Sequence, residues 1–527
     1  MPLECLFSGS SGACFELRDD SAYYAASTYL VSLNGEPRFN GNTNVFSLFD
    51  LAPATSYTLG ISREGAPDEE LIFQTAPESC AVSVYAFGAL GDGITDDTQA
   101  IQSAIDFLPR NGRLYFPKGV YLSRPLTLKS HMTMELSENA VLLGSADRSR
   151  YPVIPGDAAD LSGGEDVNFG GFEGESKPMY QSLLTAAFAE DIAIVGRGTV
   201  DGNAQNGDFW TSFRDFAPAR PRLLFFHRCN GITVHGITMR NSPSWHLHPH
   251  YSKDISVLDV LVTAPKDSPN TDALDPEACD LVRVIGCRFS VGDDCIAVKS
   301  GKIDMGKRFR QPAQNHEIRN CLMESGHGAI TLGSETAAGV AGLNVERCLF
   351  LHTDRGLRIK TRRGRGKFCR ITDIVFRDIR MDGVLTPFVI NMWYNCCDAD
   401  RFSEYNRTRN ALPVDDRTPR LGRFTFSNIV CSNAEVAACY IDGLPEMPVD
   451  EVRFENVSVA FAKDARPGKP AMLCDAKDFC RSGFYLDNVR RAVFKNVTIE
   501  GAAGEAVVAA HCDQLEIESL REVHREI

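Results

Sequence analysis

Long apolar runs are missing from this chain of 527 residues. None approaches the ~20 consecutive apolar residues that a membrane-spanning helix needs, so we expect no membrane partner. The N-terminus also lacks the basic stretch and the apolar stretch of roughly 7–15 residues that make up a secretory signal. If this start is native, the sequence predicts a cytoplasmic protein.

Positive charge is in deficit as well. Lys and Arg total 55 against 69 Asp and Glu, which gives a formal net charge of −14. An acidic chain does not attract nucleic acid or anionic lipid through its overall field, so we expect no nucleic-acid partner. The 17 cysteines include no Cys-x-x-Cys pair with zinc spacing. We interpret them as small buried apolar residues rather than as a disulfide framework.

The composition is otherwise that of an ordinary soluble protein, with 43% apolar and 24% charged residues. It excludes a disordered or collagen-like chain. The first ~80 residues differ from the rest, because short alternating runs typical of strands are separated there by turn residues. These runs are Ala25–Leu33, Asn44–Phe49, Tyr57–Ile61 and Leu71–Gln74.

Two stretches of this first region resemble the fibronectin type III pattern. They are Leu51–Leu59, with Tyr57 near a strand start, and the closing Phe73–Pro77. In that family such a Tyr closes a corner of a β-sandwich. We therefore predict a small β-sandwich over residues 1–78 and a second domain over residues 79–527.

A glycine-rich turn followed by a helical pattern occupies residues 84–105. Asp96 is placed to cap the helix, with Gln99 three residues later to reciprocate. One apolar stripe runs along it, formed by Ala100, Ile101, Ala104 and Ile105. The segment resembles the entry into the pectin-degrading right-handed β-helix superfamily, where such a helix covers the open end. The first coil needs covering because it exposes apolar surface and unpaired strand edges.

From about residue 190 one short pattern recurs every ~20–35 residues. Its apolar period of two indicates strands, and each copy is too small to bury a core alone, which indicates stacked coils. The copies are Asp191–Val195, Gly231–Val234, Asp254–Val257, Asp280–Val284, Glu317–Cys321, Asn344–Cys348, Asp373–Phe376, Glu451–Phe454 and Val489–Val493. Three longer intervals are predicted loops on the binding side: Tyr151–Pro178, Gly301–Asn315 and Cys396–Arg423.

Polar residues interrupt this pattern at corresponding places in consecutive coils. Stacked strands lie ~4.8 Å apart, so these residues are expected to line one strip of surface. Like charges held close cannot all ionise, so one carboxyl can act as a general acid while the others activate a water. An ordinary turn explains any single motif, but four in register favour an acid–base site. The motifs are Asn270-Thr-Asp272, Gly292-Asp293-Asp294, Gly326-His327-Gly328 and Arg358-Ile-Lys360.

These four motifs, in this order, resemble family 28 of the glycoside hydrolases, the polygalacturonases. The resemblance covers about residues 84–500. It implies an all-β fold, a right-handed parallel β-helix, and inverting hydrolysis of α-1,4 bonds between galacturonic acid units, without metal or cofactor. It also implies that Asp293 is the general acid and that Asp272 and Asp294 hold and deprotonate the attacking water. His327 would then tune the proton of the acid.

Basic residues gather around the last motif. Eight Lys or Arg and no Asp or Glu lie between residues 355 and 370. This local reversal of charge suits an acidic sugar, because Arg pairs with a carboxylate through two hydrogen bonds. A solvated basic loop or a contact with nucleic acid is the alternative. The resemblance assigns the sugar carboxylate to Arg358 and Lys360, and further substrate-binding candidates are Asn270, Lys299 and, on a looser match, Tyr394.

Two details depart from the regular pattern. Ala273 stands where the family usually has Gly, and a positive φ would be strained there. Neighbours in a strand point to opposite faces, so Asp293 and Asp294 can share a cleft only if the chain bends, as Gly292 suggests. We also expect the Asp293 carboxyl to lie about 6.5–9.5 Å, the inverting range, from that of Asp272 or Asp294.

A histidine-rich stretch adds a weaker signal. His246, His248 and His250 could suggest a metal, but this spacing also occurs in ordinary strands. Trp245 precedes Asp272 by about one coil, so it or the histidines could line the cleft.

The sequence therefore predicts an exo-polygalacturonase that releases galacturonic acid or its dimer from the non-reducing end of oligogalacturonides. The exo preference follows because a cytoplasmic enzyme would meet short imported oligosaccharides, and because the loops at 301–315 and 396–423 could close one end of the groove. The alternatives are a hydrolase of rhamnogalacturonan or xylogalacturonan, a Ca²⁺-dependent pectate lyase, and a non-catalytic carbohydrate-binding β-helix.

Overall fold

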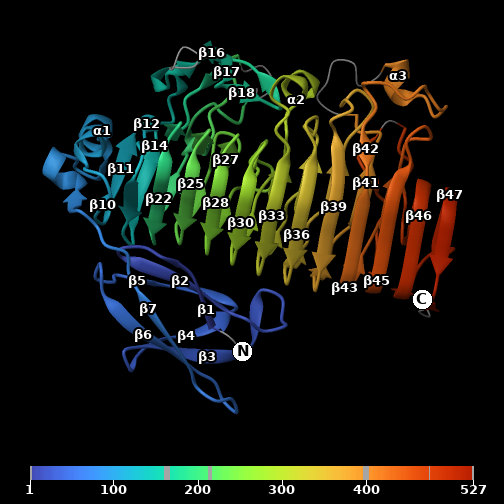
Figure 1. Ribbon diagram of the computed structural model, residues 1–527, viewed down its shortest axis with the longest axis horizontal. Helices are drawn as coiled ribbons and strands as arrows, with labels where there is room; N and C mark the ends of the chain where they lie inside the picture. The colour runs from blue at the N-terminus through green and yellow to red at the C-terminus, as the bar shows by residue number, and fades with distance from the viewer. Residues whose placement is uncertain (1–2, 160–165, 212–216, 396–402, 474, 525–527) are drawn as a thin grey trace.

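The structure is a computed structural model of the whole chain. It describes all residues except 1–2, 160–165, 212–216, 396–402, 474 and 525–527. A sheet of 31 strands and a second sheet of four strands wind together into a right-handed parallel β-helix, with a smaller all-β module beside it (Figure 1). The predicted fold class is confirmed.

The coils of the β-helix stack as three faces of parallel strands. Equivalent apolar residues sit directly over one another, as in the register Ile192, Ile232, Ile255 and Val282. Their side chains fill the interior, because each coil buries its apolar face only against its neighbours. All nine sequence repeats overlap strands of the long face, and most lie wholly within them. This face contains β10 (Gly112–Phe116), β13 (Met132–Leu136), β22 (Glu190–Gly196), β25 (Asn230–His235), β28 (Lys253–Leu258), β30 (Asp280–Ile285), β33 (Ala313–Arg319), β36 (Val340–Glu346), β39 (Arg370–Arg377), β43 (Arg423–Ala434), β45 (Val449–Phe461) and β46 (Ser482–Glu500).

The other two faces have shorter strands. One face consists of short strands that follow the first nine long strands, whereas β43, β45 and β46 themselves continue into it. The short strands are β11 (Gly119–Ser123), β14 (Ala140–Gly144), β23 (Thr199–Asp201), β26 (Thr238–Arg240), β29 (Leu261–Thr263), β31 (Arg288–Ser290), β34 (Leu322–Glu324), β37 (Leu349–Leu351) and β40 (Arg380–Asp382). The third face carries the polar motifs. Its strands are β12 (Leu126–Thr127), β21 (Leu184–Ala187), β24 (Leu224–His227), β27 (Leu247–His250), β32 (Ile296–Val298), β35 (Ile330–Gly333), β38 (Arg355–Lys360), β41 (Thr386–Asn391) and β44 (Ala437–Asp442).

Helix α1 (Thr98–Phe107) packs its apolar stripe onto the first coils, as predicted. Its predicted cap is confirmed in part, because the Asp96 carboxylate accepts a hydrogen bond from the N–H of Thr98, the first helical residue, at 3.1 Å. The residue that precedes the helix is Asp97, whose carboxylate instead accepts hydrogen bonds from the N–H groups of Leu90 and Gly91 at 2.7 and 2.9 Å. Gln99 does not reach back, because its amide donates to Ser103. The carboxylate of Asp97 therefore ties down the glycine-rich turn.

The N-terminal module consists of two antiparallel sheets that pack face to face around a small core. The sheets are β1-β2-β5 and β4-β3-β6-β7, which contain β1 (Leu3–Ser8), β2 (Gly12–Leu17), β3 (Tyr24–Leu33), β4 (Glu36–Thr43), β5 (Val45–Phe49), β6 (Ser56–Ser62) and β7 (Glu69–Gln74). The Tyr57 hydroxyl accepts a hydrogen bond from the Ala52 N–H at 2.9 Å, which closes the corner expected for that tyrosine. Membership of the fibronectin type III family stays a prediction.

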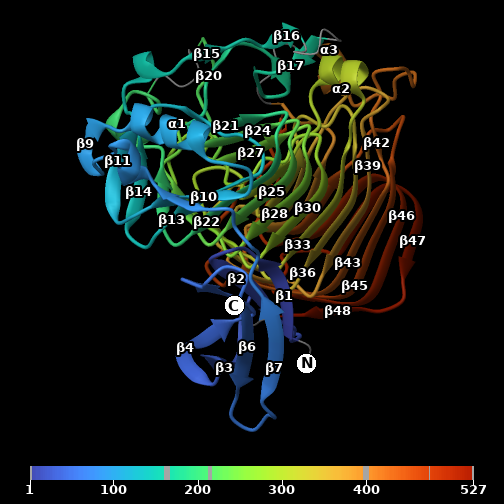
Figure 2. The same ribbon diagram turned by 60° about the vertical axis from the view of Figure 1, so that its left-hand side comes forward.

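This module docks on the long face of the β-helix (Figure 2). Val45 and Cys14 pack on Leu258 and Ile285. Beside them the Glu16 carboxylate, which is completely buried, accepts hydrogen bonds from side chains of three residues of the β-helix: Arg319, Asn320 and Arg347.

The three predicted loops leave the β-helix along the same edge (Figure 1). The first forms small hairpins between β15 (Val153–Ile154) and β20 (Met179–Tyr180). The others contain short helices that the sequence did not suggest, α2 (Ile303–Phe309) and α3 (Glu404–Arg407).

Fourteen cysteines among the described residues are free, and ten of them are buried. Those ten confirm the interpretation as small core residues. Among the described residues, no helix has both the length and the apolar character needed to cross a bilayer.

Candidate active site

The polar motifs meet on the third face because the coils are in register. Leu274 pairs with Ile296, Ile296 with Ile330, and Ile330 with Leu357. Counting back two residues from the first three places Asp272, Asp294 and Gly328 at one position of successive coils. The alignment that the sequence suggested is the one in the structure.

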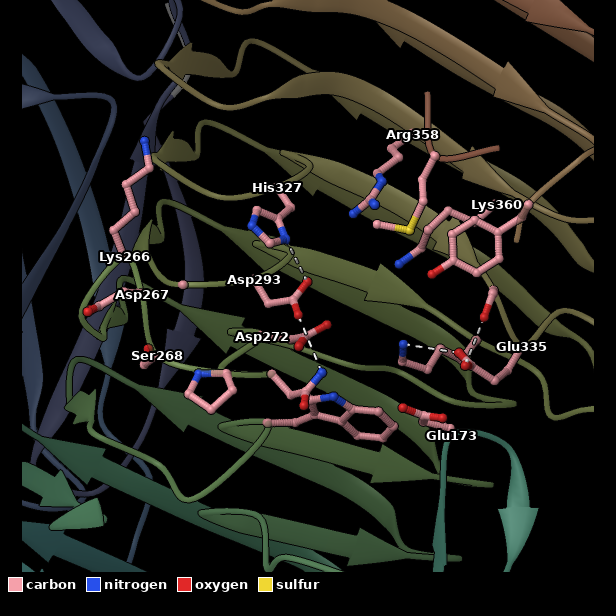
Figure 3. A pocket seen from close by; sticks show the side chains of 18 residues that line it. Glu173, Lys266, Asp267, Ser268, Asp272, Asp293, His327, Glu335, Arg358 and Lys360 are labelled. Carbon is pink, nitrogen blue, oxygen red and sulfur yellow. Dashed lines mark hydrogen bonds and ion pairs between the residues drawn. The ribbon is translucent and has the colours of Figure 1, made fainter. Parts of the chain in front are cut away.

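A pocket of about 340 Å³ opens over this strip (Figure 3). Eight of the nine candidate site residues line it, and the ninth, Asp294, lies beneath them, completely buried. The lining comprises Glu173, Trp245, Lys266, Asp267, Ser268, Pro269, Asn270, Asp272, Gly292, Asp293, Lys299, His327, Ser334, Glu335, Arg358, Lys360, Tyr394 and Met472.

The three aspartates form one tight cluster. One oxygen each of Asp272, Asp293 and Asp294 can be chosen so that all three lie within 4.8 Å of one another. The nearest oxygens therefore lie closer together than about 6.5–9.5 Å, while that separation for the carboxyl groups as wholes stays a prediction.

Glycines allow this crowding. Asp293 and Asp294 precede β32 and lie in an irregular stretch, so their side chains do not have to point to opposite faces as they would in a regular strand. A Cβ on Gly292 would lie 2.4 Å from the Ser268 carbonyl oxygen, and one on Gly328 would lie 3.0 Å from Asp294 Oδ1. Ala273, by contrast, is buried in the core outside the positive-φ region, so the expected strain does not arise.

Asp294 is held by the two cations of the last motif. Arg358 Nη1 donates to Asp294 Oδ1 at 2.9 Å, and Lys360 Nζ donates to Asp294 Oδ2 at 2.7 Å. Burial alone would raise the pKa of Asp294, but these two cations hold it far below its ordinary value. Asp294 is therefore ionised, and it holds the two cations in place at the pocket wall.

Asp293 faces the pocket and pairs with His327. Its Oδ1 lies 3.4 Å from His327 Nδ1, and its Oδ2 accepts a long hydrogen bond of 3.5 Å from the Asn270 amide (Figure 3). Burial raises the pKa of Asp293, but the interaction with His327 outweighs it, and the net pKa lies below the ordinary value. The pKa of His327 is raised in turn, chiefly by Asp293. In the free protein this pair is an ion pair with one proton on the imidazole.

Asp272 behaves in the opposite way. Burial, reinforced by the negative charges of Asp275 and Asp293, raises its pKa well above the ordinary value. Its Oδ1 has no hydrogen-bond partner among the described residues. The pKa values of the cluster therefore diverge as predicted, with one carboxyl raised and two lowered. The raised pKa belongs to Asp272, however, and not to Asp293, the acid that the resemblance implies.

Lys299 lies at the floor of the pocket and is buried. Its Nζ is 3.2 Å from Glu335 Oε2 and 3.3 Å from Asp275 Oδ1, and it lies over the Trp245 ring at 4.6 Å. Burial raises the pKa of Asp275 to about 8 against the opposing charge of Lys299. Lys299 thus connects the strip to the aromatic wall formed by Trp245.

Sequence reasoning missed three residues that shape the pocket. Glu335 follows β35, and its pKa falls to about 2 because Lys299 and other cations outweigh burial. Glu173 reaches in from the loop at 151–178, and burial, with the nearby Glu335, raises its pKa. Arg220 donates to the Asn270 side chain at 2.5 Å and fixes the loop above Asp293. None belongs to a repeat, and only the location of Glu173 in a predicted binding loop gave a signal.

The histidine stretch is structural. His246, His248 and His250 are buried, and burial lowers the pKa of each. His248 Nε2 lies 3.1 Å from Glu277 Oε2. Trp245, as anticipated, lines the pocket.

Among the described residues, only the Asp272–Asp293–Asp294 cluster brings three potential metal ligands within reach of one ion. Both oxygens of Asp294 already bind Arg358 and Lys360. These cations supply the positive charge that a metal would bring, so the cluster is not arranged as a cation site.

Comparison with known proteins agrees with this geometry. The family model "Glycosyl hydrolases family 28" matches residues 161–477, and "Rhamnogalacturonase A/epimerase, pectate lyase-like" matches residues 81–161. A probable polygalacturonase of Vitis vinifera is 32% identical over 423 residues, 78% of this chain and 81% of the relative.

Solved structures agree in fold. The family 28 exopolygalacturonase of Yersinia enterocolitica superposes with a TM-score of 0.70 at 19% identity, covering 99% of this chain and 98% of that one. A hyperthermoactive exopolygalacturonase of Thermotoga maritima gives a TM-score of 0.62 at 25% identity, covering 74% of this chain and 89% of that one.

Proposed function

Because the chain belongs to family 28 of the glycosyl hydrolases, we propose that it is an exo-acting polygalacturonase. Its substrate is an oligogalacturonide, which it cleaves from the non-reducing end with inversion of configuration. The observation that carries the proposal is the Asp272–Asp293–Asp294 cluster, which lies beside Arg358 and Lys360 in one pocket.

The cations at the pocket wall suit a uronic acid. Arg358 and Lys360 already hold Asp294, and a sugar carboxylate entering the pocket would share them. Tyr394 lies with its ring 5.7 Å from Lys360 Nζ and completes this corner. The added negative charge would raise the pKa of Asp293 toward the range that a general acid needs.

One proton is shared within the catalytic cluster. The Asp293–His327 pair carries one proton in the free protein, and its transfer from imidazole to carboxyl makes Asp293 the acid for the leaving oxygen. Asp272, which lines the pocket and has a raised pKa, then takes up the proton of the attacking water, while Asp294 helps to hold that water.

Inversion requires that a water fits between the carboxyls. The nearest oxygens lie within 4.8 Å of one another. A water that makes hydrogen bonds of ~2.8 Å can bridge two oxygens at this spacing. The cluster can therefore hold an attacking water between its nearest oxygens, as an inverting enzyme requires.

Exo action is supported by a wall at one end of the pocket. The described parts of the predicted loops at 301–315 and 396–423 do not line it. The wall comes instead from the segment before residue 474. There the Asn391 amide donates to the Met472 carbonyl at 2.9 Å, and Tyr394 pairs with Leu473. Met472 lines the pocket on the side of this segment, while Glu173 enters from the loop at 151–178. The Thermotoga protein named above is also an exopolygalacturonase.

Product analysis tests this proposal. Tetragalacturonate labelled at its reducing end is incubated with the protein, and the products are separated over time by anion-exchange chromatography. An exo enzyme releases unlabelled mono- or digalacturonate first and keeps the label on the shortened chain. An early mixture of labelled products of all lengths contradicts exo action, and a product absorbing ultraviolet light would show a lyase.

A further inference from the structure

A second and larger pocket lies on the same face of the β-helix, closer to the C-terminal end. It has a volume of about 590 Å³. The wall segment separates the two pockets, because Met472 lines the catalytic pocket while its neighbour Leu473 lines the second. The second pocket is lined by Trp393, Arg409, Tyr440, Asp442, Pro445, Leu473, Asp475, Ala476, Lys477, Phe479, Tyr485, Asp487, Asn488 and His511.

Register places this pocket in line with the catalytic strip. Lys360 pairs with Asn391, Asn391 with Asp442, and Asp442 with Asp487. Since each step is one strand spacing of ~4.8 Å, Asp442 lies about 10 Å beyond Lys360 along the β-helix. The second pocket is thus near the catalytic one but outside it.

Aromatic rings form one side of the second pocket. Tyr440 and Tyr485 stack with centroids 5.2 Å apart and an interplanar angle of 10°, and Phe479 meets both edge-on at 5.6 and 5.8 Å. Tyr485 and Phe479 are partly exposed. Rings fixed in this way offer a preformed apolar surface that needs no ordering when a flat ligand binds.

The charges beside these rings do not suit a uronate. Arg409, the cation nearest the pocket floor, donates to both oxygens of Asp442 at 2.8 and 2.9 Å and lies 3.9 Å from the Trp393 ring centre. The Tyr440 hydroxyl also donates to Asp442, which is 2% exposed. The Arg409 guanidinium therefore already binds one carboxylate through Nη1, and only its remaining N–H groups could meet a second one.

Hydrogen-bond acceptors remain available at the rim. Asp487 Oδ1 lies 2.8 Å from His511 Nδ1, and its Oδ2 has no hydrogen-bond partner among the described residues. A carboxylate oxygen accepts hydrogen bonds from hydroxyl groups and repels a second carboxylate. Aromatic faces next to such acceptors are the combination that a neutral sugar requires, with one face of C–H bonds and a ring of hydroxyl donors.

We propose that this second pocket binds a neutral pyranose, with its apolar face on Tyr485 and Phe479 and its hydroxyls donating to Asp487. The site differs from the catalytic pocket in ligand class, since it takes an uncharged sugar while the catalytic pocket is proposed to take a uronate. Binding here does not depend on hydrolysis, so it can be tested independently of the proposed function.

Ligand-observed NMR with the full chain tests the proposal. Methyl β-D-galactopyranoside and methyl β-D-xylopyranoside serve as neutral probes, and galacturonic acid serves as the charged comparison. Saturable binding of at least one neutral probe is expected. Tyr485→Ala should weaken it at least about tenfold, or ~1.4 kcal/mol. Asp487→Asn should also weaken binding of the neutral probe. Because this substitution keeps the side-chain shape, it serves as the test if Tyr485→Ala does not fold.

Two controls separate this site from the catalytic pocket. Tyr85→Ala removes a partly exposed tyrosine from the other end of the β-helix and should leave binding unchanged. Both pocket variants should cleave linear trigalacturonate at the wild-type rate. The proposal is overturned if neither neutral probe binds, if binding survives in the folded pocket variants, or if the pocket variants lose galacturonic acid binding equally.

Discussion

Removing the Lys360 ammonium tests the charge recognition at the active site. Lys360→Met keeps most of the aliphatic stem and removes the group that lies 2.7 Å from Asp294 Oδ2. The Asp294 carboxylate is completely buried, and the Lys360 side chain is 10% exposed. Loss of one member of a buried, hydrogen-bonded charge pair costs ~2–5 kcal/mol. We expect kcat/KM for trigalacturonate to fall by about 30-fold to about 5,000-fold.

The lower half of that range is favoured because Arg358 still holds the other oxygen of Asp294. The assay is initial-rate release of reducing sugar under conditions where thermal melting shows the variant to be folded. Lys367→Ala is the matched control, since Lys367 belongs to the same basic run but is exposed and pairs with Asp416 at the surface. Surface pairs contribute about 0–1 kcal/mol, so the control should retain wild-type kinetics.

A second substrate separates two roles of Lys360. The wild type should turn over the methyl ester of the same oligomer poorly, because the ester offers no charge to Arg358 and Lys360. In Lys360→Met the preference for the free acid should shrink. A loss of less than about threefold on the free acid refutes the reasoning, and an unchanged preference shows that Lys360 serves Asp294 alone.

Three further perturbations test other parts of the account. Asp293→Asn keeps the shape but removes the acid, so the rate should fall by at least ~10²–10⁴-fold with substrate still bound, and retention of a tenth of the rate contradicts the assignment. The pKa of His327 is raised above its ordinary value of about 6.5, so the Asp293–His327 pair keeps its proton until the pH passes that raised pKa. His327→Ala should move the basic limb of kcat/KM to lower pH, and an unmoved limb excludes the shared proton. Glu16→Ala removes the buried carboxylate that Arg319 and Arg347 share in the module interface and leaves them only their partners Glu317 and Glu346. It should lower the free energy of unfolding by ~3–5 kcal/mol without changing kcat, whereas an unchanged melting temperature would show that docking is weak.

The sequence predicted the β-helix and most of the site because both depend on short-range periodicity. A period of two identifies strands, and the repeat length sets which residues are stacked. Once Leu274, Ile296 and Ile330 are aligned, the positions of Asp272, Asp294 and Gly328 follow.

Features that depend on long-range packing were not predictable in this way. Glu173 lies more than 100 residues before Glu335, and only the folded loop brings both to one pocket. Glu16 gives no signal in a short strand, although it anchors the module to Arg319. The role of Asp97 gave no signal either, because its carboxylate binds a turn seven residues earlier in the chain.

The sequence also could not predict which carboxyls of the cluster have raised pKa values and which have lowered ones. Asp272 and Asp294 occupy equivalent positions in neighbouring coils, yet their pKa values shift in opposite directions. The difference arises because Arg358 and Lys360 reach Asp294, while Asp272 is buried beside Asp275 and Asp293. Motif spacing gives the identity of these residues but not which of them receives the cations.

The central claim is hydrolysis of an α-galacturonosidic bond by a water held in the Asp272–Asp293–Asp294 cluster, and proton NMR of the first product tests it most directly. Trigalacturonate is mixed with the protein, and the anomeric protons are recorded before mutarotation equilibrates the released sugar. The account predicts new galacturonic acid or digalacturonate whose reducing end appears first as the β anomer. First appearance of the α anomer, or of an unsaturated product, would contradict it.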